Sequence, residues 1–431
     1  MESLTRNLSS KKAVIGVIGL GYVGLPRCIQ FLKSKFRVYG FDNDIKKLES
    51  LKKNKSYLSN LSSKILKKHS KNFICTDDFN LIKKTDIIII CVPTPITKKL
   101  LPDLSNVKET LNLIKKNLKK NQAISFESTT YPGTTEELIL PIIKKKFKVG
   151  KDFYLIYSPE RDDPGLKIDN KKVPRLVSGY TKKCLLVGEK IYKTIVDKPV
   201  MVSSIKVAEM SKLYENIFRS INISLVNETK FILKKLNINI NEVIDAAKSK
   251  PFGFMPFFPG PGYGGHCIPV DPFYFIWLAK KHGLNSKFIE LSGKINTSIP
   301  EWICEQIKTE LKKRFKKISN SKVLILGIAY KKNINDDRES PAYKLIEILS
   351  KKYNCKISYH DPFIDNAKKF NIKNFNTKSI SLTKNNLKSY DYGIIVTDHD
   401  SLNYKKLKKD IKFIFDTRDI RHLNGDNVIK L

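Results

Sequence analysis

Residues 19–24, with the sequence GLGYVG, limit the possible folds of this chain more than any other feature. They follow a short apolar run at 13–18 and precede a helix-like run at 25–34, and a second apolar run at 37–41 leads into Asp42. Glycines in this spacing permit a tight turn, close approach of a pyrophosphate and close packing of the helix on the strand. An acid after the second strand binds ribose hydroxyls and repels a 2′-phosphate, so the pattern predicts a β-α-β unit that binds NAD rather than NADP. The residues expected at the cofactor are Gly19, Gly21, Tyr22, Val23, Gly24 and Asp42.

Three more apolar runs continue this strand rhythm, at 86–92, 123–127 and 154–157. Polar residues follow each run: Thr94 after the first, Thr129 after the second and Glu160 after the third. Because ligands of open α/β folds bind at the carboxyl ends of parallel strands, these residues are expected near a ligand. From the residues alone, Glu160 is either an acid/base or water-orienting group or a solvated loop carboxylate.

The loop at 260–272, GPGYGGHCIPVDP, places Cys267 among glycines and prolines, with Asp271 four residues later. The thiol is a potential nucleophile and Asp271 a potential orienting or proton-handling group. The alternative is that Cys267 is an ordinary small hydrophobic residue. The chain has seven cysteines, and no two share a C-x-x-C spacing, so we expect a reducing compartment and neither a disulfide framework nor a metal site. A nicotinamide cofactor together with a nucleophilic cysteine suggests an oxidation through a thiol-bound intermediate.

The middle of the chain, at about 207–236, has the apolar spacing of a helix, with Lys212 and Asn216 one turn apart on one face. Lys212 is either solvated at its tip or an active-site cation that stabilises an alkoxide.

After residue 320 the alternation of strands and helices restarts without a second GxGxxG, which predicts a second Rossmann-like lobe. Its strand ends carry lysine and arginine, which suit an anion such as a diphosphate.

The net charge is +38, from 80 lysines and arginines against 42 aspartates and glutamates. One reading is a protein that binds nucleic acid or an acidic membrane surface. We favour a lysine-rich composition instead, because the lysines are scattered in short runs and the aromatic residues do not interleave with them in the pattern of a nucleic-acid recognition module. No apolar run approaches the roughly 18 residues that span a bilayer. We therefore expect a cytoplasmic protein with no nucleic-acid or membrane partner.

Five separated motifs together resemble the UDP-glucose/GDP-mannose dehydrogenase family: GLGYVG, SPER, the Lys212/Asn216 helix, GGHCIPVDP and the YKK…RESP segment. The resemblance runs from about residue 13 to the carboxyl terminus. It implies two Rossmann-like lobes joined by a central helical region that forms a homodimer or a higher homo-oligomer. The implied domains are an NAD-binding domain at 1–203, a helical domain with the cysteine loop at 204–305 and a UDP-sugar-binding domain at 306–431.

The resemblance also implies a role for individual residues. Cys267 attacks the C6 aldehyde of a UDP-sugar to form a thiohemiacetal, which is oxidised to a thioester; each turnover converts CH2OH to carboxylate and reduces two NAD+. Lys212 and Asp271 hold the C6 oxygen and a water, Glu160 helps hydrolyse the thioester, and Asn216 lies near the sugar. The implied contacts to NAD are Thr94, Thr129 and Arg338. The implied contacts to substrate are Glu160, Arg161, Lys212, Asn216, Gly264, Lys331 and Arg418.

Residues 250–279 are similar to UDP-N-acetylglucosamine 6-dehydrogenases of surface-polysaccharide pathways, and His266 differs from typical UDP-glucose enzymes. UDP-N-acetylmannosamine, UDP-N-acetylgalactosamine and UDP-glucose remain alternative substrates, because a pocket discriminates epimers by only about 1–3 kcal/mol. A two-electron dehydrogenase that needs no cysteine is a further alternative. The chain departs from the family at Lys248 and Lys250: in this region the family carries an arginine that reaches the substrate of the partner subunit, and this chain has lysines instead. It departs again at Arg27-Cys28, where small residues are usual and no role is assigned.

Overall fold

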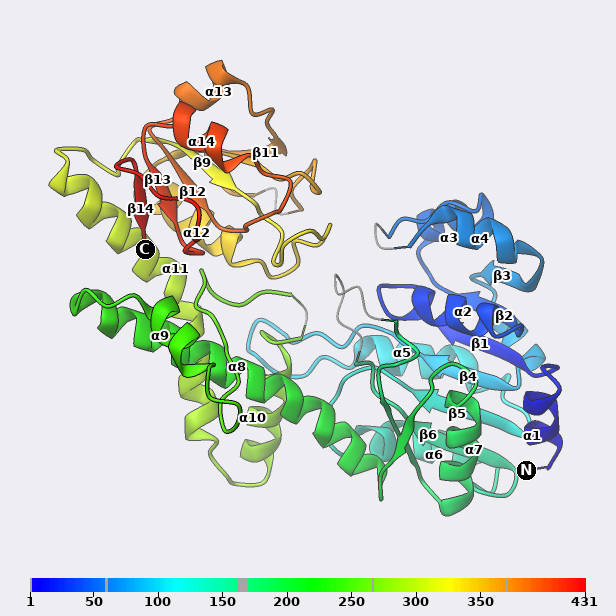
Figure 1. The fold of residues 1–431 in the computed structure, drawn as a ribbon. Helices are drawn as coiled ribbons and strands as arrows, with labels where there is room; N and C mark the ends of the chain where they lie inside the picture. The colour runs from blue at the N-terminus through cyan, green and yellow to red at the C-terminus, as the bar shows by residue number, and fades with distance from the viewer. Residues whose placement is uncertain (1, 59–60, 162–168, 266, 369–370) are drawn as a thin grey trace. The chain divides into compact units, whose positions relative to one another are not determined.

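The computed structural model of the protein describes residues 2–58, 61–161, 169–265, 267–368 and 371–431. The chain divides into two compact units. The first comprises Met1–Glu215 with Phe273–His282, and the second comprises Asn216–Pro272 with Gly283–Leu431. Each unit contains one β-sheet with helices packed around it; the first is coloured blue to green and the second green to red in Figure 1.

The described part of the first unit forms an eight-stranded sheet in the order β3-β2-β1-β4-β5-β6-β7-β8. Strands β1 to β6 are parallel, β7 is antiparallel to β6, and β8 is parallel to β7. The central strands are continuous apolar runs because both faces of a parallel sheet are covered. The strands are β1 (Val14–Ile18), β2 (Arg37–Phe41), β3 (Phe73–Thr76), β4 (Ile87–Ile90), β5 (Gln122–Phe126), β6 (Phe153–Tyr157), β7 (Arg175–Gly179) and β8 (Pro199–Met201).

Helix α2 (Gly24–Lys33) begins at the last glycine of GLGYVG, and its apolar residues pack against β1 in the main core of this unit. Several other helices begin at polar caps: the Asp44 carboxylate accepts the backbone N–H groups of Lys46 and Lys47 at the start of α3. The long helix α8 (Ile205–Lys235) contributes residues to both units. The remaining helices are α1 (Glu2–Ser9), α3 (Ile45–Lys52), α4 (Ser63–His69), η1 (Ser70–Asn72), η2 (Phe79–Lys84), α5 (Ser105–Ile114), η3 (Thr135–Ile139), α6 (Leu140–Lys144) and α7 (Lys182–Tyr192).

The described part of the second unit forms a six-stranded parallel sheet in the order β11-β10-β9-β12-β13-β14. Its strands are β9 (Lys322–Leu326), β10 (Lys356–His360), β11 (Phe375–Ser379), β12 (Tyr392–Ile395), β13 (Ile414–Asp416) and β14 (Val428–Lys430). Its helices are α9 (Ile240–Ala247), α11 (Lys287–Lys313), α12 (Pro341–Lys351), α13 (Lys384–Lys388) and α14 (Tyr404–Asp410). Helix α10 (Asp271–Lys281) begins in the second unit and belongs to the first unit from Phe273 onward.

The two sheets share one topology. Read in chain order, the six strands of the second sheet follow the 3-2-1-4-5-6 pattern of β1 to β6, which is the order of doubly wound nucleotide-binding folds. The prediction of an α/β chain with two Rossmann-like lobes is therefore confirmed. The domain limits at residues 203 and 305 stay a prediction.

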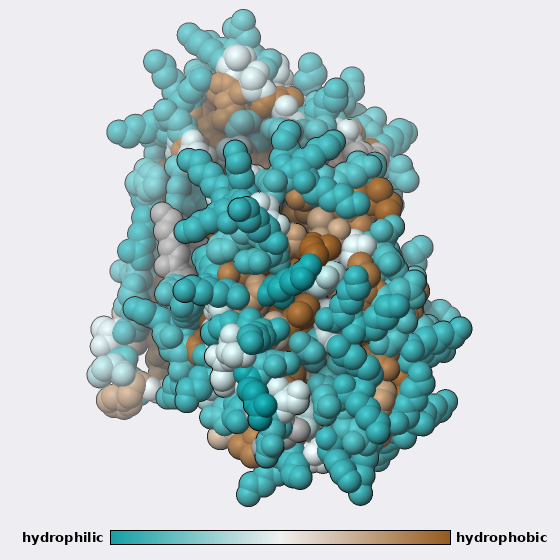
Figure 2. Space-filling view, turned by 90° about the vertical axis from the view of Figure 1, so that its right-hand side faces the viewer, coloured by the Kyte–Doolittle hydropathy of each residue, from teal (hydrophilic) through white to brown (hydrophobic). Residues whose placement is uncertain are grey.

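Within the described residues, no helix combines the length and the apolarity that a bilayer crossing requires. On the face drawn in Figure 2, hydrophilic residues are spread widely with smaller apolar patches between them. The hydrophilic residues of this face are thus distributed rather than collected in one stripe.

Candidate active site

The glycines of the GLGYVG loop explain how β1 passes into α2. A Cβ atom on Gly24 would lie 1.8 Å from the carbonyl oxygen of Gly19, so helix and loop pack here without room for a side chain. A Cβ atom on Gly21 would meet no heavy atom within 4 Å. The backbone at Gly21 is therefore open to a ligand, as a pyrophosphate-binding loop requires, and the residues present fit a dinucleotide.

Asp42 lies directly after β2 and beside this loop. Its Oδ2 accepts the backbone N–H of Leu20 at 2.7 Å, and its Oδ1 accepts that of Asp44 at 2.9 Å. The Nζ of Lys47 is 3.4 Å from the same carboxylate. The structure thus ties the predicted ribose-binding acid to the glycine loop, and its contact with ribose stays a prediction.

Thr94 and Thr129, both expected at the cofactor, lie together at the ends of β4 and β5. The Thr94 hydroxyl donates to the carbonyl of Thr129 at 2.7 Å. The segment after Thr129 is in turn fixed to α8 by Glu209, whose carboxylate accepts the backbone N–H of Gly133 at 2.6 Å and of Thr135 at 3.0 Å. Burial raises the pKa of Glu209 to about 7. Helix α8 therefore holds one of the loops at the carboxyl edge of the first sheet.

Glu160 follows β6 and lies in a cluster of buried charges. Its Oε2 forms ion pairs with Arg27 and, at 3.4 Å, with Arg175. Both arginines also pair with Glu127, at 3.1 Å from Arg27 and 2.7 Å from Arg175. Glu160 is thus an ion-paired carboxylate rather than a solvated one. Sequence reasoning missed Arg27, Glu127 and Arg175 as its neighbours; the one available signal was an arginine on the otherwise apolar start of α2.

Arg161 and Lys212 are the other predicted substrate contacts of the first unit. Arg161 donates to the carbonyl of Pro174 at 2.9 Å and pairs with Glu215 at 2.8 Å. Lys212 lies on α8 and is only 7% exposed. This burial argues against the alternative in which the tip of Lys212 is solvated.

Asn216 and Asp271 meet in the second unit. The amide nitrogen of Asn216 donates to Oδ2 of Asp271, and Arg219 donates to the amide oxygen of Asn216. Asp271 is buried and begins α10. Two predicted site residues that are 55 positions apart in the sequence are therefore in direct contact.

Cys267 differs from the other cysteines of the chain, all of which the structure describes. It is exposed, whereas Cys28, Cys75, Cys91, Cys184, Cys304 and Cys355 are buried. Its carbonyl oxygen accepts the backbone N–H groups of Val270 at 3.1 Å and Asp271 at 2.8 Å. This turn holds the accessible thiol next to the start of α10, and His266 beside it lies outside the described residues.

The cysteine loop packs against the other motifs of the second unit. The N–H of Gly265 donates to the carbonyl of Arg338 at 2.9 Å, and a Cβ atom on Gly264 would lie 2.7 Å from Cβ of Tyr330, next to Lys331. A Cβ atom on Gly260 would lie 2.9 Å from Nη1 of Arg418. Lys331, Arg338 and Arg418 thus belong to segments that meet around one loop, although they are far apart in sequence.

Other contacts hold the two arginines of this group. Arg338 pairs with Asp336 at 2.7 Å, and Nε of Arg418 donates to the carbonyl of Val396 at 2.7 Å. Their contacts with NAD and with the sugar nucleotide stay predictions.

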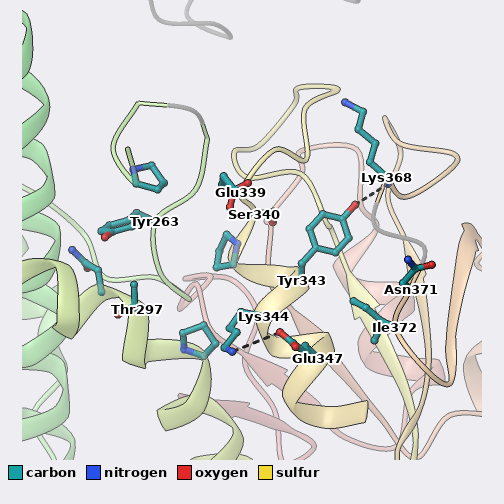
Figure 3. A pocket seen from close by; sticks show the side chains of 14 residues that line it. Tyr263, Thr297, Glu339, Ser340, Tyr343, Lys344, Glu347, Lys368, Asn371 and Ile372 are labelled. Carbon is teal, nitrogen blue, oxygen red and sulfur yellow. Dashed lines mark hydrogen bonds and ion pairs between the residues drawn. The ribbon is translucent and has the colours of Figure 1, made fainter. Parts of the chain in front are cut away.

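A cavity of about 660 Å³ lies beside this loop (Figure 3). Tyr263 of the cysteine loop and Ser340 of RESP are on its wall. Its Lys344 pairs with Glu347 at 3.6 Å, and its Lys368 pairs with Asp337 at 3.3 Å. None of the predicted substrate-binding residues lines this cavity.

The fold and the loop at Gly21 define the class of this protein: a dinucleotide-binding protein built on a Rossmann fold. The chain belongs to the UDP-glucose/GDP-mannose dehydrogenase family. The NAD binding domain of that family matches residues 13–196, the central domain 206–298 and the UDP binding domain 324–422. The protein is therefore an NAD-dependent UDP-sugar dehydrogenase.

Known relatives cover nearly the whole chain. Protein CapL of Staphylococcus aureus is 35% identical over 425 residues, which is 96% of this chain and 97% of that protein. UDP-N-acetyl-D-glucosamine 6-dehydrogenase of Salmonella typhi is 35% identical over 355 residues, or 81% of this chain and 82% of that protein. The solved structure of a UDP-D-ManNAc dehydrogenase from Pyrococcus horikoshii has a TM-score of 0.85 and 29% identity, covering 97% of this chain and 98% of that one.

Proposed function

We propose that this enzyme oxidises the C6 hydroxymethyl group of UDP-N-acetylglucosamine to the carboxylate in a four-electron reaction, for surface-polysaccharide synthesis. Cys267 carries the proposal: it is the exposed cysteine of the chain, and it lies in a turn that leads directly into Asp271. The similarity to the Salmonella typhi enzyme supports the choice of sugar. UDP-N-acetylmannosamine is the second candidate, favoured by the similarity to the Pyrococcus horikoshii structure.

The overall reaction consumes one CH2OH group, one water and two NAD+, and it yields one carboxylate, two NADH and three protons. NAD, when bound, accepts a hydride in each of the two oxidations. An aldehyde carbonyl gives up hydride readily only after a nucleophile has made it tetrahedral. In our proposal the Cys267 sulfur adds to the C6 aldehyde, and the C–S bond persists through the second oxidation as a thioester.

The last step is hydrolysis of that thioester. A water loses a proton to Glu160 as its oxygen adds to the carbonyl carbon, and the C–S bond then breaks to return the Cys267 thiolate and the free acid. Lys212 and Asp271 would hold and polarise the C6 oxygen and the water. Asn216 would contact the sugar and, through its hydrogen bond, orient Asp271.

The residues of the glycine loop and the strand ends would hold NAD. Gly21 offers open backbone to the pyrophosphate, Asp42 lies where the ribose is expected, and Thr94 and Thr129 flank the same sheet edge. In the second unit, Lys331 and Arg418 would pair with the diphosphate of the UDP-sugar.

The test is the ratio of NADH formed to sugar consumed, measured with purified protein, NAD+ and a panel of UDP- and GDP-sugars. We expect two NADH per UDP-N-acetylglucosamine and an acid product. The same ratio with UDP-N-acetylmannosamine, UDP-N-acetylgalactosamine or UDP-glucose would keep the chemistry and change the substrate. One NADH per sugar with an aldehyde or keto product would refute the four-electron reaction.

We also propose that two copies of the chain associate through α8. Exposed apolar residues recur along this helix at intervals of seven or four, which forms one stripe: Val207, Tyr214, Phe218, Leu225 and Ile232. Two helices pack together along such a stripe. In a two-fold dimer, the stripe of one chain would pack against the same stripe of the other chain.

Sedimentation should therefore give twice the 49.5 kDa mass of one chain. The double substitution Leu225→Glu/Ile232→Glu should reduce that mass to one chain. Phe315→Glu is the matched control, because Phe315 is 99% exposed and lies off the stripe. A wild-type protein with the mass of one chain would contradict the proposal.

A further inference from the structure

Arg27 is the residue for which the sequence indicates no role, and the structure buries it almost completely. Only 1% of its side chain is exposed. Arginine is rarely buried unless its charge is paired, so an arginine inside a small α/β core requires a specific partner. The burial of Arg27 therefore indicates a carboxylate partner that Arg27 holds in place within this unit.

Its guanidinium bridges two carboxylates that follow neighbouring strands. Nε lies 3.1 Å from Oε2 of Glu127, which follows β5, and Nη2 pairs with Oε2 of Glu160, which follows β6. Nη1 donates to the side-chain oxygen of Gln30, one turn further along α2. A planar guanidinium fixed at all three nitrogens has one orientation, and it transfers that orientation to its acceptors.

The two carboxylates differ in how completely they are held. Glu127 is 0% exposed and also contacts Arg175 at 2.7 Å, the Tyr192 hydroxyl at 2.6 Å and the Cys91 sulfur at 3.8 Å. Glu160 is 14% exposed, and its Oε1 accepts the backbone N–H of Arg161 at 2.8 Å. Glu127 is thus enclosed by protein, whereas Glu160 is the member of the cluster that retains a path to solvent.

We propose that Arg27 is a positioning residue for Glu160: through its bridge to the enclosed Glu127, it fixes the Glu160 carboxylate at the carboxyl end of β6. The proposal rests on the proposed function, in which Glu160 takes the proton of the water that hydrolyses the thioester. Arg175, at 3.4 Å from the same oxygen, is the second support. A base displaced by about 1 Å loses on the order of 10²-fold in rate.

The predicted signature is a selective loss of the hydrolytic step. In Arg27→Leu the two oxidations proceed but the thioester on Cys267 is released slowly. Mixing the enzyme with NAD+ and the UDP-sugar that it oxidises should then give a burst approaching two NADH per chain. A steady state should follow, with a kcat about 10–100-fold below wild type. The acyl adduct on Cys267 should be visible by intact mass after acid quench, and kcat/KM for the sugar should change little, because the slowed step follows the two oxidations.

Glu160→Gln is the reference variant, because it removes the base itself. It should accumulate the same adduct, and Arg27→Leu/Glu160→Gln should be no slower than Glu160→Gln alone. If Glu160→Gln shows no adduct, the role given to Glu160 in the proposed function fails, and the Arg27 proposal fails with it. If Glu160→Gln accumulates the adduct but Arg27→Leu turns over like wild type, only the Arg27 proposal is overturned.

Arg27→Leu leaves Glu127 with one fewer cation and can unfold the first unit, so two further variants carry the test. Arg27→Leu/Glu127→Gln removes one charge of each sign and keeps the Arg175–Glu160 pair. Arg27→Lys keeps the charge but replaces the planar fork by a single ammonium. Both should fold, as judged by thermal unfolding, and both should show the burst and the adduct. Wild-type turnover in both would show that Arg27 serves only to neutralise Glu127.

Discussion

Replacing Cys267 by alanine should abolish the net oxidation of the UDP-sugar to its acid, with a loss of about 10³-fold or more in acid formation. Without the thiol the aldehyde has no protein nucleophile, so the second hydride transfer lacks its tetrahedral precursor. The measurement is the acid product by mass spectrometry together with NADH per sugar consumed. Because Cys267 is exposed, we expect the substitution to leave the melting temperature unchanged.

Cys75→Ala is the matched control, because Cys75 is a buried cysteine of β3 that burial keeps as a thiol by raising its pKa. This variant should form acid at the wild-type rate. Acid formation that survives in Cys267→Ala would instead support a dehydrogenase that needs no thiol intermediate.

The second large effect is expected at the glycine loop, from two substitutions that differ only in position. Gly24→Ala should destabilise the first unit by about 3 kcal/mol, because its Cβ would stand 1.8 Å from a backbone oxygen that cannot move without breaking the loop. Gly21→Ala should leave stability within about 0.5 kcal/mol of wild type, because its Cβ enters open space.

The affinity for NAD should also distinguish the two variants. In Gly21→Ala the new methyl group occupies the position that the pyrophosphate approaches, so the affinity for NAD should fall at least roughly tenfold in a folded protein. Thermal unfolding and calorimetric titration with NAD check both statements. Wild-type affinity for NAD in Gly21→Ala would show that NAD does not bind at this loop. A wild-type melting temperature in Gly24→Ala would contradict the close packing of Gly24 on Gly19.

Most of the two sheets could be predicted from the sequence, because a strand buried on both faces is a continuous apolar run. The runs at 37–41 and 154–157 correspond to β2 and β6 within one residue. Other elements gave weaker signals. Strand β11 (FNTKS) is polar and partly exposed, and α11 continues through Pro300, a residue that usually ends a helix.

The candidate site divides in the same way. The sequence by itself determined the dinucleotide loop, the cysteine set among glycines and prolines, and the placement of Lys212 and Asn216 one turn apart on one helix, because each is written in a short local spacing. Only the tertiary structure decided that Asn216 donates to Asp271 and that Arg27 bridges Glu127 and Glu160, which are 100 and 133 positions away from it. A local pattern tells which residues are buried. Which charges they meet depends on the order in which the strands assemble, and that order brings the ends of β5 and β6 together beside the first turn of α2.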